Sequence, residues 1–181
     1  MAGNYLEVFI EGIRSTWGPL GTEMVAGCRR RLEELLKAPA TEAWLRALHA
    51  DAPPNKALYR DPIHGFALLA HSEYEGLYRP PHDHGRSWVI YAVQRGEIEM
   101  GTFVRMERPD GNVELVKKES ILVRAGEVKV FLPGDIHDTR CISETALLFR
   151  FTERDLKKEE EEAGLVTRFV ERDGVWTVET P

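Results

Sequence analysis

Cysteine is scarce in this sequence, whose 181 residues contain only Cys28 and Cys141. Two cysteines so far apart do not suggest a disulfide framework, so we interpret both as free thiols. Long apolar runs are also lacking, because no segment approaches the roughly 20 apolar residues of a bilayer-spanning helix. Residues 1–7 lack the basic and then apolar pattern of a secretion signal. These features argue against a disulfide-rich secreted protein and against a membrane span, and we expect a cytoplasmic protein.

Positive charge is not in excess either. Asp and Glu outnumber Lys and Arg by 30 to 24, which gives a formal net charge of −6 at pH 7. Nucleic acids and anionic membranes attract proteins mainly through clustered positive charge, so we expect neither as a partner. Hydrophobic residues make up 43% of the chain, enough for the core of one globular domain, which we assign to residues 1–181. The sequence leaves the oligomeric state open.

The pattern of apolar residues changes once along the chain. Within residues 1–50, apolar side chains recur at spacings of three and four, which predicts an N-terminal helical layer with Thr22 as a helix cap. Two prolines in the segment 51–55 then end the helical pattern, because proline disfavours a helical conformation in the residue before it. No repeat or low-complexity linker follows, so we keep both parts in one domain.

Short strand-like runs dominate residues 56–152. Turn signals, among them residues 110–112 and Pro133-Gly134, separate these runs at the spacing of an antiparallel barrel or sandwich. In residues 153–181, a charged run predicts a solvated helix or loop, and the sequence around Asp173-Gly174 predicts a closing hairpin. The predicted fold class is therefore mainly β, with a helical N-terminal segment.

The most informative motif is His82-Asp83-His84. Side chains alternate along a strand, so two histidines separated by one residue lie on the same face and can bind one ion. His137 follows the turn at Pro133-Gly134, and a neighbouring strand could bring its imidazole to the same point. Three neutral imidazoles on one side of an ion leave its other positions open, as a catalytic metal site requires. We predict a metal site formed by these three histidines.

The residues around the histidines resemble the two motifs of the cupin superfamily. The matching positions are Gly76, His82, His84 and Gly96 in the first motif and Gly126, Pro133, Gly134 and His137 in the second. The second match departs in one respect, because Pro133 directly precedes Gly134 where the usual motif has one residue between them. The resemblance implies a double-stranded β-helix, or jelly-roll, barrel over residues 56–152.

Two further positions depart from the usual cupin motifs. Val89 stands where a glutamate usually binds the metal, and Cys141 stands where an asparagine usually follows the last histidine. A site of three histidines without the acid is similar to that of the thiol dioxygenases, the cysteine dioxygenase group, which are cupins with a helical N-terminal segment and Fe(II). The resemblance therefore implies Fe(II), O₂ and a small-molecule substrate. Imidazole suits several ions, so Mn, Ni and Zn stay open as alternatives.

Other positions of the cysteine dioxygenase pattern differ. Leu148, Arg150 and Thr152 fall where that group has a network of Ser, His and Tyr. The string from Pro81 to Tyr91 looks more like bacterial cupins that are loosely described as cysteine dioxygenase-like. We therefore interpret the chain as an atypical member of this branch.

Two arginines are candidates for binding a substrate carboxylate. Tyr59-Arg60 is similar to the segment that supplies the carboxylate-binding arginine in the cysteine dioxygenase group, although the spacing differs. Arg150 would point into the barrel if the strand register places it on the same face as His137, and a guanidinium binds a carboxylate in bidentate geometry. A structural ion pair is the alternative for each arginine.

Alternation along an unbroken strand also predicts the faces of nearby residues. Trp88 would face inward with His84, whereas Tyr91 would face the opposite side unless a bulge intervenes. Asp83 would point away from the metal and serve as a turn or supporting residue. We interpret Cys141 as a buried packing residue and His71 as a polar strand end, not as ligands.

One function hypothesis and two alternatives follow. The first is a non-haem Fe(II) dioxygenase that oxidises a small thiol-bearing carboxylate, such as cysteine or 3-mercaptopropionate, with O₂. The second is a three-histidine metal cupin with another small-molecule reaction, such as diketone cleavage or isomerisation. The third is a non-enzymatic, metal-dependent binding module for a small ligand. Metal content and the requirement for O₂ distinguish these hypotheses.

Overall fold

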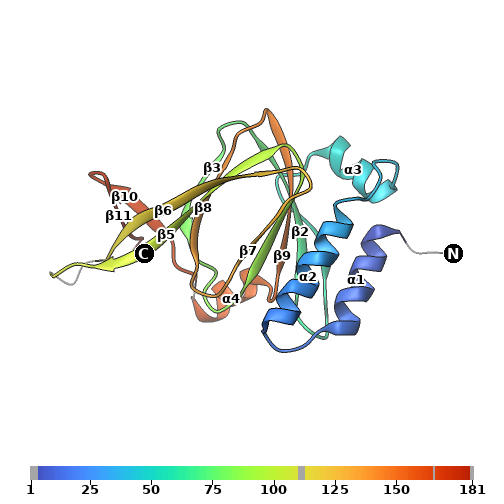
Figure 1. The fold of residues 1–181 in the computed structure, drawn as a ribbon, viewed down its shortest axis with the longest axis horizontal. Coiled ribbons are helices and arrows are strands. Elements are labelled where there is room, and N and C mark those ends of the chain that lie inside the picture. Colours follow the sequence, from blue (N-terminus) through green and yellow to red (C-terminus); the bar gives the residue numbers. More distant parts are fainter. Residues whose placement is uncertain (1–3, 110–112, 165, 180–181) are drawn as a thin grey trace.

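The computed structural model describes residues 4–109, 113–164 and 166–179, and Figure 1 shows its elements. The helices are α1 (Tyr5–Thr16), α2 (Thr22–Leu35), α3 (Ala43–Asp51) and α4 (Leu156–Ala163). The strands are β1 (Lys56–Arg60), β2 (Ala67–Tyr74), β3 (Tyr78–His82), β4 (Val89–Arg95), β5 (Glu97–Glu107), β6 (Val113–Arg124), β7 (Val128–Phe131), β8 (Ile136–Cys141), β9 (Thr145–Thr152), β10 (Phe169–Arg172) and β11 (Val175–Val178). The turn predicted at residues 110–112 lies outside the described residues.

The predicted N-terminal helical layer is present as α1, α2 and α3. The first helix begins with a capping box, in which the Asn4 side chain accepts a hydrogen bond of 3.0 Å from the backbone N–H of Glu7. The prediction of Thr22 as a cap is wrong, because Gly21 occupies that position of α2 and makes no side-chain hydrogen bond. None of the described helices is long and apolar enough to span a membrane.

Two antiparallel sheets face each other and form the barrel. Their strand orders are β1-β2-β9-β4-β7 and β3-β8-β5-β6. From β2 to β9 the chain crosses from one sheet to the other at every connection except the one between β5 and β6. Such winding of strand pairs is the jelly-roll arrangement that the cupin resemblance implies. The predicted mainly β fold with N-terminal helices is therefore confirmed.

The five-stranded sheet is buried on both faces. Its outer face packs against α1, α2 and α3 through side chains such as Phe9, Ile13, Phe66, Phe149 and Phe151, and Figure 1 shows these helices beside the barrel. Its inner face packs against the other sheet in a second core. Every residue from Val89 to Val93 is consequently buried, so hydrophobic alternation does not mark the two faces of β4.

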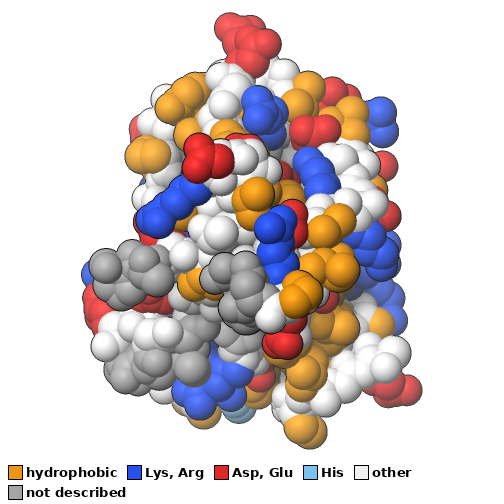
Figure 2. Space-filling view, turned by 90° about the vertical axis from the view of Figure 1, so that its left-hand side faces the viewer, with side chains coloured by type: hydrophobic (Ala, Val, Ile, Leu, Met, Phe, Trp, Pro, Cys, Tyr) orange, Lys and Arg blue, Asp and Glu red, His pale blue; other side chains and the backbone are white. Residues whose placement is uncertain are grey.

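The C-terminal segment lies against one end of the barrel. The predicted charged helix is α4, and the Asp155 side chain accepts a hydrogen bond from the backbone N–H of Lys157 at its start. The predicted closing hairpin is formed by β10 and β11, and Phe169 and Trp176 pack with Phe103 of β5 and its neighbours. Acidic and basic side chains are interspersed on the face in Figure 2.

Candidate metal centre and substrate cavity

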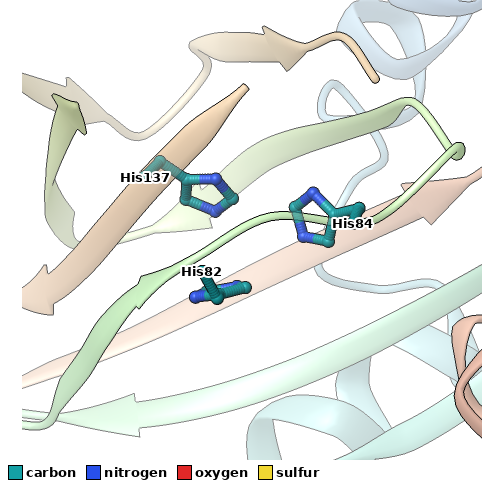
Figure 3. Close-up of side chains that lie close together, drawn as sticks. All are labelled: His82, His84 and His137. Atoms are coloured by element: carbon teal, nitrogen blue, oxygen red, sulfur yellow. The ribbon is translucent and has the colours of Figure 1, made fainter. Parts of the chain in front are cut away.

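Two adjacent strands and one loop position the three predicted histidines. His82 ends β3 and lies directly across from His137 of β8, while His84 lies in the loop that follows β3. The ring centroids are 4.6 Å apart for His82 and His137, 4.9 Å for His84 and His137, and 5.2 Å for His82 and His84. The rings point toward one another in Figure 3, and one ligand atom from each lies within 4.8 Å of the others. The structure thus brings together the three predicted ligands.

Hydrogen bonding leaves ligand atoms of these rings available. The Nδ1 of His82 lies 2.9 Å from the Pro80 carbonyl oxygen, which can only accept, so Nδ1 carries the hydrogen and Nε2 keeps its lone pair. The Nδ1 of His84 and both ring nitrogens of His137 are buried without a hydrogen-bond partner among the described residues. Unpartnered buried nitrogens are costly, and a bound metal ion would satisfy them. The donor set therefore fits a transition-metal ion.

Burial keeps the three imidazoles neutral. It lowers the pKa of His84 to about 2 and lowers the pKa of His137 well below its ordinary value of 6.5, and the neighbouring histidines and Arg150 add to both shifts. Burial also lowers the pKa of His82. A metal binds the neutral imidazole, so the ligands are ready at neutral pH without losing a proton.

Asp83 fixes the loop that carries two of the ligands. Its Oδ1 accepts hydrogen bonds from the backbone N–H groups of Gly85 at 3.0 Å and Thr167 at 2.9 Å, and its Oδ2 pairs with Arg105 at 3.1 Å. Asp83 therefore ties the histidine loop to the C-terminal segment and to β5. This placement agrees with the predicted role as a turn and supporting residue.

The predicted faces of Trp88 and Tyr91 are both wrong. The chain leaves one sheet after His82, turns at Gly85 with a φ of 59°, and enters the other sheet at Val89, so alternation does not continue between these points. Trp88 points to the helical layer, where its ring stacks on Trp17 at 6.3 Å. The Tyr91 hydroxyl instead lies 3.4 Å from Nε2 of His84. Tyr91 is thus part of the site.

A cavity of about 670 Å³ opens from the histidines along the barrel. Its volume lies within the range of about 300–1,000 Å³ that small-molecule sites occupy. Its inner wall comes from β2, β3, β4, β8 and β9, and its mouth is bordered by α4 and β10. The inner lining consists of His71, Glu73, Arg79, His82, His84, Tyr91, Thr139, Leu148 and Arg150.

Arg150 reaches this cavity from β9. It lies across from Tyr91 on β4, and its positive charge lowers the pKa of the Tyr91 hydroxyl, against the larger effect of burial. Its Nε is buried and has no partner in the described part of the chain. Its positive charge lowers the pKa of all three histidines, which places it close to the ligands. A half-buried guanidinium with an unpartnered Nε beside the three histidines is suited to an anionic ligand.

Arg60 is placed differently. It lies outside the lining of the cavity and pairs with Asp155 through an Nε–Oδ2 distance of 2.6 Å, with 48% of its side chain exposed. Its neighbour Asp61 pairs with Arg14 instead. Of the two arginines predicted from the sequence, the structure brings only Arg150 to the histidines. Arg60 connects β1 to the start of α4.

Sequence reasoning missed three polar groups of the cavity. Glu73 is buried and pairs with Arg79 at 3.0 Å, and His71, interpreted as a strand end, is also buried on the inner wall. The signal was present in β2, because Leu69, His71 and Glu73 alternate with the small or apolar residues Leu68, Ala70 and Ser72 of the other face. The interpretation of Cys141 as a packing residue is confirmed by its place in the core between the sheets.

Comparisons with known proteins match the fold only. No protein-family model matches the sequence, and no curated protein matches it either. Among solved structures, the Cnp3 cupin domain of Schizosaccharomyces pombe matches with a TM-score of 0.45 and 13% identity, over 61% of this chain and 66% of that chain.

Two other solved structures match at a similar level. KdgF from a Halomonas species has a TM-score of 0.43 and 17% identity, over 54% of this chain and 74% of that chain. An oxalate oxidase in complex with glycolate has a TM-score of 0.42 and 21% identity, over 56% of this chain and 51% of that chain. These likenesses are low, so the functional argument rests on this chain's own three-histidine cluster, in a barrel whose neighbours include cupin-domain proteins.

Proposed function

We propose that this protein is a non-haem Fe(II) dioxygenase that oxidises a small thiol-bearing carboxylate with O₂. The observation that carries the proposal is the meeting of three neutral imidazoles with the half-buried guanidinium of Arg150 in one cavity. No carboxylate joins the histidine cluster among the described residues. An ion held only by neutral ligands keeps its full positive charge, which favours an anionic ligand such as a thiolate.

Different residues of the cavity would bind the metal ion and the substrate. His82, His84 and His137 would hold the ion on one side, and a bound Fe(II) would supply the electrons that activate O₂. Arg150 would bind the substrate carboxylate and so orient the thiol toward the histidines. Burial raises the pKa of Tyr91, so its hydroxyl stays protonated at neutral pH and can donate a hydrogen bond to the bound substrate. The balanced reaction is RSH + O₂ → RSO₂H.

Oxygen uptake by the iron-loaded protein tests the proposal. The protein is loaded anaerobically with Fe(II) and mixed with O₂ and either cysteine, 3-mercaptopropionate, mercaptosuccinate or cysteamine. We expect one O₂ consumed per sulfinate formed with a carboxylate-bearing thiol, and much slower uptake with cysteamine, which offers Arg150 no carboxylate. No uptake with any of the thiols would contradict the proposal. Parallel loading with Mn, Ni and Zn identifies the competing metal-dependent reactions.

The metal site itself is tested by substitution of one ligand. We expect His84→Ala to reduce bound metal from about one ion per chain to almost none, because two imidazoles remain. The matched control is His64→Ala, which removes an exposed histidine that stacks near Trp17 outside the cavity. Metal content is measured by elemental analysis after dialysis. Equal metal in both variants would show that the ion binds elsewhere.

A further inference from the structure

The cavity continues past the histidines along the inner face of β2. Leu69, His71 and Glu73 occupy successive inward positions of this strand. Only 7% of His71 and 3% of Glu73 are exposed, and both line the cavity. The oxidation proposed above uses neither side chain. Because both polar side chains are buried in a cavity of ligand size, we ask which part of a ligand they could bind.

His71 and Glu73 each present an unused hydrogen-bond acceptor. The His71 ring donates to the Pro54 carbonyl, and burial holds its pKa at about 3, so its Nε2 is a lone-pair acceptor at neutral pH. The Oε1 of Glu73 accepts from Nε of Arg79 at 3.0 Å, which leaves Oε2. Both acceptor atoms are buried, and neither has a hydrogen-bond partner among the described residues.

These two acceptors lie on neighbouring inward positions of one strand, whose Cα atoms are about 6.7 Å apart. An NH₂ group that donates two hydrogen bonds of about 2.9 Å spans about 5 Å between its acceptors, so it can meet both side chains where they lean toward each other. Across the barrel, Thr139 of β8 is 2% exposed, lines the same cavity, and has a buried Oγ1 without a partner in the described residues. Its hydroxyl can donate to an oxygen of the same ligand group.

Charge balance favours an uncharged group at this place. Arg79 already neutralises Glu73, and a substrate carboxylate would neutralise Arg150. An additional ammonium would lie near the Arg79 guanidinium without an anion of its own. A primary carboxamide carries two N–H donors and one oxygen acceptor and has no net charge. It complements the acceptors of His71 and Glu73 together with the donor of Thr139.

The register places the Glu73 end of this site far from Arg150, while His71 lies between the two levels. In the pairing of β2 with β9, Arg150 lies across from Leu69 and Ala146 lies across from Glu73. Four residues of strand separate these levels, which corresponds to about 13 Å. Leu148, across from His71, forms an apolar wall between them. A substrate that reaches both ends is longer than cysteine, in which the carboxylate and the amine share one carbon.

We propose that the substrate is an elongated thiol acid whose far end carries a primary carboxamide bound by His71, Glu73 and Thr139. The thiol and carboxylate ends of this substrate rest on the proposed function. The carboxamide site rests only on the unpartnered polar groups of His71, Glu73 and Thr139. The site sets the length and the end group of the substrate.

Binding of thiol-free probes tests the far end separately from the chemistry. The probes are the monoamides of four-, six- and eight-carbon dicarboxylic acids, the methyl-terminated acids of equal length, and the corresponding ω-amino acids. Calorimetry uses the metal-free protein and the protein loaded with Zn(II). We expect the longer monoamides to bind about tenfold more tightly than the methyl-terminated acids, and the four-carbon monoamide to show no such advantage.

Matched variants test whether His71, Glu73 and Thr139 cause the tighter binding of the monoamides over the methyl-terminated acids, here called the monoamide advantage. Glu73→Gln should remove most of the monoamide advantage, because its NH₂ group replaces an acceptor with a donor, while the exposed neighbour change Glu75→Gln should leave the advantage intact. Thr139→Val should reduce the advantage several-fold and provides a second test if Glu73→Gln does not fold, which circular dichroism shows.

Three outcomes would overturn the carboxamide site: equal binding of methyl-terminated acids, tighter binding of the ω-amino acids, or a full monoamide advantage in folded Glu73→Gln. Because these probes carry no thiol and need no O₂, failure of the oxygen-uptake test leaves their result unaffected. Rapid oxidation of short thiol acids combined with no monoamide preference would leave the dioxygenase proposal standing and remove only this inference.

Discussion

Arg150 is a half-buried cation next to the three histidines, and this placement gives it a specific function in the proposed reaction. Its Nε is buried without a partner among the described residues, and its charge lowers the pKa of the neighbouring Tyr91 hydroxyl, against the larger effect of burial. A planar guanidinium can hold both oxygens of a carboxylate, whereas a lysine ammonium cannot reproduce this geometry. The residue therefore matters through the shape of its side chain as well as through its charge.

Replacement of Arg150 by lysine tests this function. We expect Arg150→Lys to raise the KM for 3-mercaptopropionate by 10-fold or more, since hydrogen bonds to charged groups contribute about 1.5–3 kcal/mol. The control is Arg60→Lys, which alters a half-exposed ion pair outside the cavity and should change KM less than twofold. Steady-state oxygen uptake measures both variants. A larger effect of the Arg60 change would assign carboxylate binding to that residue.

Among the elements, the turn between β4 and β5 depends on one glycine. Gly96 has a φ of 83°, and a Cβ atom there would lie 2.5 Å from the Thr145 carbonyl oxygen. Gly126 has a similar φ of 89°, but no atom lies within 4 Å of the position of its Cβ. Both glycines belong to the predicted motifs, and only the first is also packed against neighbouring backbone. Alanine at Gly126 would therefore meet only the strain of a positive φ, whereas alanine at Gly96 would meet that strain and a steric clash.

Alanine at each glycine gives a measurable difference. Gly126→Ala should destabilise the fold by about 1–2 kcal/mol, the cost of a left-handed conformation for a residue with a Cβ. Gly96→Ala should cost a further 1–3 kcal/mol, roughly, because backbone must shift to admit the methyl group. Urea unfolding measures both free energies. Equal losses would mean that the backbone around Thr145 adapts without cost.

The helical layer is a second element whose contribution can be measured. Ile13 of α1 is fully buried against the five-stranded sheet, while Val8 of the same helix is 56% exposed. We expect Ile13→Ala to lower the free energy of unfolding by about 2–5 kcal/mol through lost burial and a cavity. Val8→Ala should change it by less than about 0.5 kcal/mol. A small effect at Ile13 in urea unfolding would show that the layer is loosely attached.

At the scale of the whole molecule, buried histidines make the metal-free fold sensitive to acid. Burial lowers the pKa of His71 to about 3 and that of His84 to about 2, from 6.5, and lowers the pKa of His137 as well. Below pH 6.5 the unfolded chain binds protons that the folded chain does not. Stability is therefore fully present above about pH 6.5 and is lost as the pH falls toward the folded pKa values.

The acid sensitivity has an expected slope. Each of the three histidines should contribute about 1.4 kcal/mol of lost stability per pH unit between roughly pH 5.5 and 4. Urea unfolding of the metal-free protein across this range measures the total slope. His71→Gln should lower the slope by the contribution of one protonating group, about 1.4 kcal/mol per pH unit, whereas the exposed control His64→Gln should leave the slope unchanged. A flat profile in the unchanged protein would contradict neutral buried imidazoles.

The sequence by itself determined the three histidines, the helical layer and the closing hairpin, because each depends on local spacing. Apolar residues at three and four form a helix face, whatever lies across from them. The spacing of the histidines identified the ligands, but the expected shared strand is wrong, because β3 ends at His82 and His84 lies in the following loop. The motif glycines and the Pro-Gly turn, through their resemblance to cupin motifs, predicted a jelly-roll barrel. These features need no knowledge of which strands pair.

Only the tertiary structure decided the walls of the cavity. The chain crosses between the sheets near Gly85, and this crossing turns Tyr91 inward and Trp88 outward. Both faces of the five-stranded sheet are buried and apolar, so the pattern of apolar residues does not show which side chains face inward. Packing of one sheet on the other brought Arg150 to the histidines and Glu73 to Arg79, while Arg60 pairs with Asp155 outside the cavity. The physical reason is that register and packing join residues far apart in the chain, and local spacing carries no information about that distance.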